Sequence, residues 1–318
     1  MKAFYSDHFV LPLPEGHRFP MQKYRLVHEG VQNLCAGITL HEAPTTTDGV
    51  LALAHHPDYI AAVSSGTLTL SAQKEIGFPW SLKMVERSRR SVGATIAACR
   101  TALTSSDQIA VNLAGGTHHA YADHGGGFCV FNDAVIAARL MQAERHVQRV
   151  AIVDLDVHQG NGTASILARD ESIFTLSLHG AGNYPFSKES SDLDVGLRDG
   201  TQDAEYLNVL QDALDQLFSR FAPQLIIYLA GADPHEGDRL GRLKLSMEGL
   251  AQRDQMVFSA AAQRVIPVAV TMAGGYGKNI QDTVAVHLQT IALAARHASR
   301  QITYFAAGSG DSAPSTTG

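Results

Sequence analysis

The sequence predicts an α/β fold, in which a single domain is built on an open, mostly parallel β-sheet with helices on both faces. From about residue 92 onward, short apolar β-branched runs alternate with longer segments of helical periodicity. A succession of strand, helix and strand is typical of a parallel sheet that is covered on both faces. The chain has no internal repeat and no linker-like break in composition, so we expect one domain over residues 1–305. Residues 306–318 are small, polar and aperiodic, which predicts a flexible C-terminal tail.

Strands and helices are expected to alternate over most of the chain. The expected strands cover residues 109–113, 150–153, 173–178, 225–230 and 266–272. Apolar residues from Leu207 to Phe221 recur at intervals of three and four, which predicts a helix. Ser246 is a candidate N-cap for a second helix. This helix and two others are expected at residues 246–265, 132–144 and 279–298. The first ninety residues are expected to form loops and helices packed on the sheet.

The bulk composition argues against several classes of protein. The 318 residues are 45% hydrophobic, which is ample for a packed core, and they carry a formal net charge of -6. This charge argues against direct nucleic-acid binding, since neutralising phosphates requires a concentrated basic surface. No apolar stretch is long enough to span a bilayer and no signal peptide is evident, so we expect a soluble cytoplasmic protein without a membrane partner. Cys35, Cys99 and Cys129 form no C-x-x-C pair, which predicts neither disulfides nor a cysteine zinc site.

The most informative segment follows a predicted strand and reads Asp154-Leu155-Asp156-Val157-His158. Because alternate side chains of an extended chain share a face, we expect Asp154, Asp156 and His158 to point to the same side. Leu155 and Val157 are then expected to face the core. Ionisable groups that converge beside an apolar strand are costly to leave unpaired, which favours a bound cation. A strand that ends in an ordinary polar turn would explain one aspartate, but it fits the whole pattern poorly.

Polar side chains also follow three other predicted strands. Two glycines precede His118 and His119, while Asp233 and Tyr276 follow the other strands. Neighbouring side chains on extended backbone diverge, so adjacent histidines can serve one cavity only where the chain turns, and the glycines permit that turn. Each residue alone has an ordinary interpretation, as a loop histidine, a cap or a core tyrosine. Ligands bind outside the carboxyl ends of parallel strands, so the shared position of these residues favours one site.

The combined residue set predicts metal-assisted amide hydrolysis. Asp156, His158 and Asp233 offer oxygen, nitrogen and oxygen ligands with positions left open, which suits a catalytic Zn²⁺ or another divalent ion such as Fe²⁺. A metal of this kind lowers the pKa of bound water to about 7 and polarises a carbonyl group.

Proton transfer can be assigned to the remaining residues as a hypothesis. Neutral His119 is expected to act as general base, and an imidazolium is expected to protonate the leaving group later. Tyr276 is expected to donate a hydrogen bond to the developing oxyanion. Asp154 is expected to lie behind His118, where it would orient the imidazole and favour its charged form.

Several motifs, in order along nearly the whole chain, carry a resemblance to a known family. They are Gly115-Gly116-Thr117-His118-His119, Gly125-Gly126-Gly127-Phe128-Cys129, Asp154-Leu155-Asp156-Val157-His158-Gln159-Gly160-Asn161-Gly162, Ala230-Gly231-Ala232-Asp233 with Glu236-Gly237-Asp238-Arg239-Leu240-Gly241, and Gly274-Gly275-Tyr276. The set resembles the zinc-dependent histone deacetylase family of the arginase/deacetylase superfamily, and is most similar to class IV and the bacterial histone-deacetylase-like amidohydrolases. The resemblance implies the arginase/deacetylase fold and a zinc-dependent deacylase that hydrolyses acyl-lysine carrying acetyl or longer acyl groups.

The resemblance also implies roles for individual residues. The implied zinc ligands and catalytic residues are Asp156, His158, Asp233, His118, His119 and Tyr276. Gly127 and Phe128 would line a narrow channel for the acyl-lysine side chain. The opposite wall has no obvious paired phenylalanine, and Tyr184 is the expected substitute. Family members often hold K⁺ mainly through backbone carbonyls, and the matching residues here are Asp154, Asp156, His158, Ser177 and Leu178.

Asn161 departs from the pattern of some family classes, which place an acid behind the second histidine. A neutral amide raises the pKa of His119 less than a carboxylate would. Asn161 is therefore expected to favour the neutral, base-competent form of His119.

Other functions remain open at this point. The superfamily includes dimanganese ureohydrolases, but Gly160 and His235 stand where further carboxylate ligands would be needed. Small acetylated amines such as acetylpolyamines rank second as substrates, because no insertion obviously constricts the entrance. A non-catalytic module that binds acyl-lysine or a metal is an interpretation from another class, and the presence of Tyr276 with both histidines counts against it.

Overall fold

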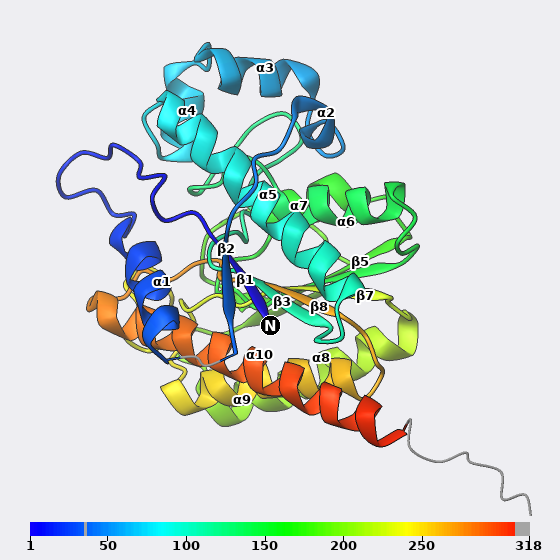
Figure 1. Ribbon diagram of the computed structural model, residues 1–318. Helices are drawn as coiled ribbons and strands as arrows, with labels where there is room; N and C mark the ends of the chain where they lie inside the picture. Colours follow the sequence, from blue (N-terminus) through cyan, green and yellow to red (C-terminus); the bar gives the residue numbers. More distant parts are fainter. Residues whose placement is uncertain (35–36, 309–318) are drawn as a thin grey trace, which may run out of the picture.

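The sheet at the centre of the structure has eight strands in the order β2-β1-β3-β8-β7-β4-β5-β6, and every neighbouring pair is parallel (Figure 1). The computed structural model describes residues 1–34 and 37–308. The strands are β1 (Lys2–Tyr5), β2 (Thr39–Glu42), β3 (Ile109–Asn112), β4 (Val150–Asp154), β5 (Ile173–Gly180), β6 (Leu193–Leu197), β7 (Leu225–Leu229) and β8 (Val268–Thr271). The predicted open parallel sheet is confirmed.

All of the strands expected from the sequence are present, with shifts of one or two residues at their ends. The expectation that the first ninety residues contain no part of the sheet is wrong, because β1 and β2 form one of its edges. These two strands have only four residues each, and β2 carries no fully buried side chain. Their short length and weak apolar pattern explain why hydrophobic periodicity does not reveal them.

Helices cover both faces of the sheet. They are α1 (Gln22–Leu34), α2 (Asp48–Leu51), α3 (Pro57–Ser65), α4 (Leu70–Ile76), α5 (Leu82–Thr104), α6 (Asp133–Ala143), α7 (Asn161–Leu167), α8 (Asp203–Arg220), α9 (Met247–Ala262) and α10 (Ile280–Gly308). Figure 1 shows α5, α6 and α7 on one face and α1, α8, α9 and α10 on the other. The short helices α2, α3 and α4 lie beyond α5, at the top of the view.

The strands are apolar on both sides because each face of the sheet packs into its own core. On β4, Ala151 and Val153 belong to the core beneath α8 and α9, whereas Val150 and Ile152 belong to the core beneath α5 and α6. This arrangement explains why the sequence shows continuous apolar runs here and not the alternation of a half-exposed strand.

One predicted helix end agrees with the structure and one differs from it. Ser246 caps α9 as predicted, since its hydroxyl oxygen accepts the backbone N–H of Gly249 at 3.0 Å. Helix α10 extends to Gly308, so the domain boundary placed at residue 305 falls inside this helix. The rest of the predicted tail, residues 309–318, lies outside the described residues, as does Cys35.

Cys99 and Cys129 are free and buried. Within the described ranges, no helix has the length and apolar character needed to cross a membrane.

Candidate active site

The sequence-predicted site residues come together at the carboxyl ends of four neighbouring strands, β3, β8, β7 and β4. The loops after β3 and β4 carry the histidine pair and the Asp154 to His158 segment, and the loops after β7 and β8 carry Asp233 and Tyr276. One cavity is lined by His118, His119, Asp156, His158 and Tyr276. Residues that are far apart in the sequence therefore share one site, as parallel-sheet topology predicts.

The segment after β4 reaches this cavity by a different geometry from the expected extended strand. Strand β4 ends at Asp154, and the chain then turns. The carboxylate of Asp154 accepts the backbone N–H of Asp156 at 3.2 Å, and that of Asp156 accepts the N–H of His158 at 2.9 Å. Leu155 and Val157 are fully buried, as expected. The aspartates thus shape the backbone of the loop that presents them.

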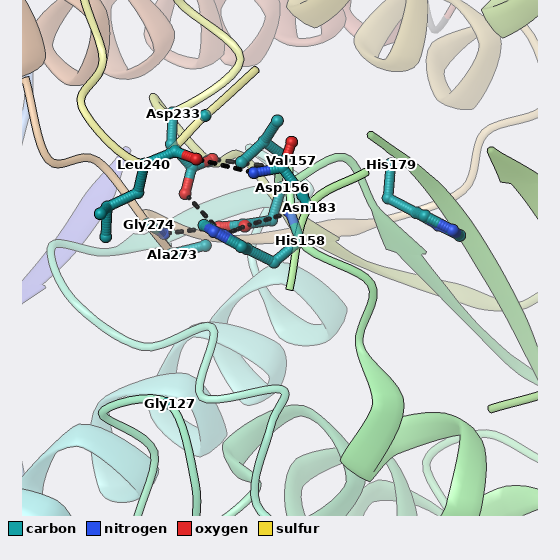
Figure 2. A network of polar contacts seen from close by, with 12 residues as sticks. Gly127, Asp156, Val157, His158, His179, Asn183, Asp233, Leu240, Ala273 and Gly274 are labelled. Carbon is teal, nitrogen blue, oxygen red and sulfur yellow. Dashed lines mark hydrogen bonds and ion pairs between the residues drawn. The ribbon is translucent and has the colours of Figure 1, made fainter. Parts of the chain in front are cut away.

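Asp156, His158 and Asp233 form a compact group, with ligand atoms that all lie within 4.8 Å of one another. Figure 2 shows the imidazole of His158 facing both carboxylates, with its Nδ1 2.9 Å from Asp156 and 3.2 Å from Asp233. Backbone N–H groups fix the carboxylates from behind, since Val157 donates to Asp233 at 3.0 Å and Gly274 donates to Asp156 at 2.7 Å. The loops after three strands therefore hold this group in place.

The electrostatics of this group suit a divalent cation. Burial alone would lower the pKa of His158, but the two carboxylates outweigh it and raise this pKa to about 10. Burial and the nearby Asp156 raise the pKa of Asp233. One oxygen of Asp233, Oδ2, is buried and has no hydrogen-bond partner among the described residues beyond its 3.2 Å ion-pair contact with Nδ1 of His158. An orphaned carboxylate oxygen beside an imidazole and a second carboxylate matches the donor set of a catalytic zinc or iron site.

The tandem histidines have different partners, and this difference separates their pKa values. The carboxylate of Asp154 accepts a hydrogen bond from Nδ1 of His118 at 2.6 Å, while the Asn161 amide oxygen lies 2.6 Å from Nδ1 of His119. Burial opposes the charged form of both rings. For His118 the carboxylates of Asp154 and Asp156 outweigh burial and raise the pKa to about 9. Burial and the neighbouring His118 and His158 hold the pKa of His119 well below its usual value.

Asp133, which the sequence analysis missed, builds the turn that brings the two histidines together. Gly115 and Gly116 adopt positive φ angles of 78° and 74°, in agreement with the expected glycine turn. The buried Asp133 carboxylate accepts the backbone N–H groups of Gly116 at 3.0 Å and Thr117 at 2.7 Å. Asp133 lies in the first turn of α6, where an acidic residue is also an ordinary helix signal. No local pattern distinguishes these two roles.

Tyr276 lines the same cavity, and its backbone is anchored by residues that the sequence did not single out. The carboxylate of Asp238 accepts the Tyr276 backbone N–H at 2.6 Å, and Lys23 Nζ donates to the Ala273 carbonyl at 3.1 Å. Burial raises the pKa of Tyr276 well above its usual value, so the hydroxyl stays protonated. The family-like stretch around Asp238 was the one signal that could have revealed this anchor.

The residues expected to form the channel, Gly127, Phe128 and Tyr184, line one pocket that also contains His119, His158 and Tyr276. Gly127 and Phe128 both have positive φ angles, and the Phe128 ring lies 5.8 Å from the ring of Tyr276. Tyr184 meets His119 edge to face at a centroid distance of 4.9 Å, across from Gly127. Tyr184 therefore lies beside His119 in this pocket, and its role as the second channel wall stays a prediction. At the opening, Phe186 is 84% exposed.

The residues expected to bind potassium lie at the end of β4, in the loop that follows it, and on the adjacent strand β5. Register pairs Asp154 of β4 with Ser177 of β5, and Leu178 follows directly. Both segments are buried, and the Ser177 hydroxyl lies 3.0 Å from Nδ1 of His179. Potassium binding at this point stays a prediction.

Comparison with known proteins gives a consistent result. Residues 17–291 match the family model of the histone deacetylase domain. The chain is 44% identical over 293 residues to an uncharacterized protein of Picosynechococcus sp., which spans 89% of this chain and 94% of that protein. It is 34% identical to histone deacetylase 2 of Arabidopsis thaliana and 29% identical to histone deacetylase RPD3 of Saccharomyces cerevisiae. These two alignments cover 76% and 82% of this chain and 64% of each relative.

Solved structures support the same assignment at the level of the fold. The crystal structure of a histone deacetylase homolog from Aquifex aeolicus superposes with a TM-score of 0.79 at 22% identity, covering 95% of this chain and 88% of that one. The HDA15 HD domain gives the same TM-score and identity, covering 95% and 94% of the two chains. The chain belongs to the histone deacetylase family, with the arginase/deacetylase fold, and is a hydrolase that acts on amides.

Proposed function

We propose that this protein is a zinc-dependent deacylase that hydrolyses the amide of acyl-lysine in peptides or proteins. The observation that carries the proposal is the convergence of Asp156 and His158 with His119 and Tyr276 around one cavity. The group that would hold a metal and the groups that can move protons would therefore be within reach of the same substrate amide.

Asp156, His158 and Asp233 would hold the ion. When bound, a divalent ion supplies Lewis acidity, which lowers the pKa of water and polarises the substrate carbonyl. The proposed metal is zinc, with Fe²⁺ as the alternative, because one imidazole nitrogen and two carboxylate oxygens with positions left open suit a catalytic site of either ion. A K⁺ ion at Asp154, Asp156, His158, Ser177 and Leu178 belongs to the same proposal.

The protein side chains supply proton transfer and orientation. His119 is the proposed general base, because its low pKa keeps the ring neutral at physiological pH. It removes a proton from the attacking water and can return a proton to the leaving lysine nitrogen. His118, charged and held by Asp154, would favour the build-up of negative charge nearby. The Tyr276 hydroxyl would donate a hydrogen bond to the oxygen that becomes negative in the transition state.

The channel and its mouth support acyl-lysine over small polycationic amines. Phe128 and Tyr184 offer apolar walls for an aliphatic side chain. The lining of the mouth includes Arg18, Lys74, Arg242 and the carboxylate of Glu75, and Arg242 is paired with Asp199 at 3.1 Å. The rim offers no excess of carboxylates to bind acetylpolyamines, whose remaining amines are protonated.

A metal-resolved turnover assay tests this proposal. The purified protein, stripped with chelator and reloaded with Zn²⁺ or Fe²⁺, is given an acetyl-lysine peptide, longer acyl-lysine peptides and acetylpolyamines. We expect acid release from the peptides only in the metal-loaded protein, and bound metal at one ion per chain. Preferential turnover of acetylpolyamines would support the second substrate class. Metal-dependent peptide binding without product would instead support a non-catalytic module and overturn the proposal.

A further inference from the structure

A chain of hydrogen bonds leads from His119 to the protein surface. The amide of Asn161 bonds to His119 with its oxygen, and its Nδ2 donates to the Tyr121 hydroxyl at 3.0 Å. That hydroxyl in turn donates to Glu189 Oε1 at 3.1 Å. Building on the proposed role of His119 as general base, we propose that Tyr121 is a positioning residue that selects the tautomer of His119.

The direction of each bond follows from the chemistry of the terminal group. A carboxylate such as Glu189 can only accept, so the single proton of the Tyr121 hydroxyl points toward it. The Tyr121 oxygen is then an acceptor on its other side, and it must face the NH₂ end of the Asn161 amide. The Asn161 oxygen consequently faces His119, and it can only accept. Nδ1 of His119 therefore carries the ring proton.

This arrangement leaves Nε2 of neutral His119 without a proton, on the side of the ring away from Asn161. A general base needs that free lone pair. His118 requires no such chain, because both oxygens of its partner Asp154 are acceptors and rotation of the carboxylate changes nothing. An amide has one donor end and one acceptor end, so Asn161 needs an external group to define which end faces the histidine.

The outer members of the chain are themselves held in place. The buried side chain of Gln159 makes two hydrogen bonds to the backbone of Glu189, at 2.7 Å to its carbonyl and 2.9 Å from its N–H. The Tyr121 ring stacks on His124 with the ring centroids 4.4 Å apart. Burial raises the pKa of Tyr121 to about 12, so its hydroxyl keeps its proton at neutral pH.

Removal of the Tyr121 hydroxyl allows the Asn161 amide to rotate and present its NH₂ group to Nδ1. His119 would then populate the tautomer with the proton on Nε2, which cannot act as the base. We expect Tyr121→Phe to lower kcat about 5- to 10-fold, the equivalent of one hydrogen bond, with KM unchanged. Tyr5→Phe, on β1 and outside the lining of the cavity, is the matched control and should leave kcat unchanged.

The decisive measurement is the tautomer of His119, read from ¹⁵N chemical shifts of histidine-labelled protein loaded with Zn²⁺. We expect the Nδ1–H tautomer in the wild type and a shift toward Nε2–H in Tyr121→Phe. In an Asn161→Asp background, the same tyrosine change should leave the tautomer unaltered, because a carboxylate accepts at either oxygen. An Nε2–H tautomer in the wild type, or an unchanged tautomer in Tyr121→Phe, would overturn the proposal. The tautomer is observed without turnover, so failure of the proposed deacylase activity would be recognised separately.

Discussion

The position of Gly274 makes a sharp prediction about the metal site. A methyl group added at this residue would lie 2.0 Å from Oδ2 of Asp233 and 2.6 Å from Oδ2 of Asp156. Ordinary contacts of such a carbon begin at 3.4 Å, so the Asp233 carboxylate must move by more than about 1 Å. The backbone N–H that bonds Asp156 is retained in Gly274→Ala. The substitution therefore acts mainly on the ligand geometry.

The expected loss of affinity follows from the tolerance of metal ligation. Metal–ligand distances vary by only about 0.2 Å, so a carboxylate displaced this far ceases to be a ligand. Zinc sites with four ligands bind with about 10–16 kcal/mol, which corresponds to about 3 kcal/mol for each ligand. We therefore expect Gly274→Ala to weaken Zn²⁺ binding by about 100-fold.

Competition with a fluorescent zinc chelator measures this change directly. Gly49→Ala is the matched control, since a methyl group there meets nothing within 4 Å. Circular dichroism and the melting temperature of the metal-free proteins establish that both variants fold. If folded Gly274→Ala binds Zn²⁺ as tightly as the wild type, then Asp233 is not a ligand, and the proposed metal site is wrong.

Further predictions concern the catalytic groups and the stability of the fold. Tyr276→Phe should lower kcat by about 100-fold or more with unchanged metal content, because an oxyanion donor is lost; an unchanged kcat would exclude that role. Asn161→Asp should raise the pKa of His119 and shift the acidic limb of the pH–rate profile toward higher pH. A profile identical to that of the wild type would contradict this expectation. Burial lowers the pKa of His55 from 6.5 to about 4, so the unfolded chain binds the proton first as the pH falls through this window. The free energy of unfolding should therefore decrease by up to about 3 kcal/mol as the pH falls from 6.5 to about 4. Urea titrations of His55→Gln should lack this part of the pH dependence. Equal pH dependence in both proteins would show that His55 does not titrate in this way.

The sequence predicted the central part of the sheet because its strands are buried on both faces. Runs such as Val150–Asp154 are continuously apolar up to their last residue, which distinguishes them from their surroundings. Strand β1 and the edge strands β2 and β6 are short or partly exposed, and their pairing depends on distant partners. No local window of sequence contains that information.

The site also contains residues that local sequence reveals and residues whose role depends on distant partners. Residues such as His119 and Tyr276 could be proposed because they follow strands and lie in recognisable motifs. Asp133 and Asp238 act by accepting backbone N–H groups of loops that are 16 to 38 residues away. An aspartate in a helix turn or a polar loop has many ordinary explanations, so its partner becomes evident only in three dimensions. The sequence did not predict the turn after β4 for a related reason. This turn depends on the carboxylates of Asp154 and Asp156, which accept backbone N–H groups two residues further along the chain.

The strand order has a consequence for synthesis of the protein. Strand β8 lies between β3 and β7, and it is made after every other strand. Until β8 is synthesised, the other strands can pair only as two separate fragments, β2-β1-β3 and β7-β4-β5-β6, whose facing edges have no native partner. The histidine pair belongs to the first fragment, and the three proposed metal ligands Asp156, His158 and Asp233 belong to the second. The complete site therefore exists only after the last strand closes the gap, and the Gly274 N–H that holds Asp156 also follows that strand.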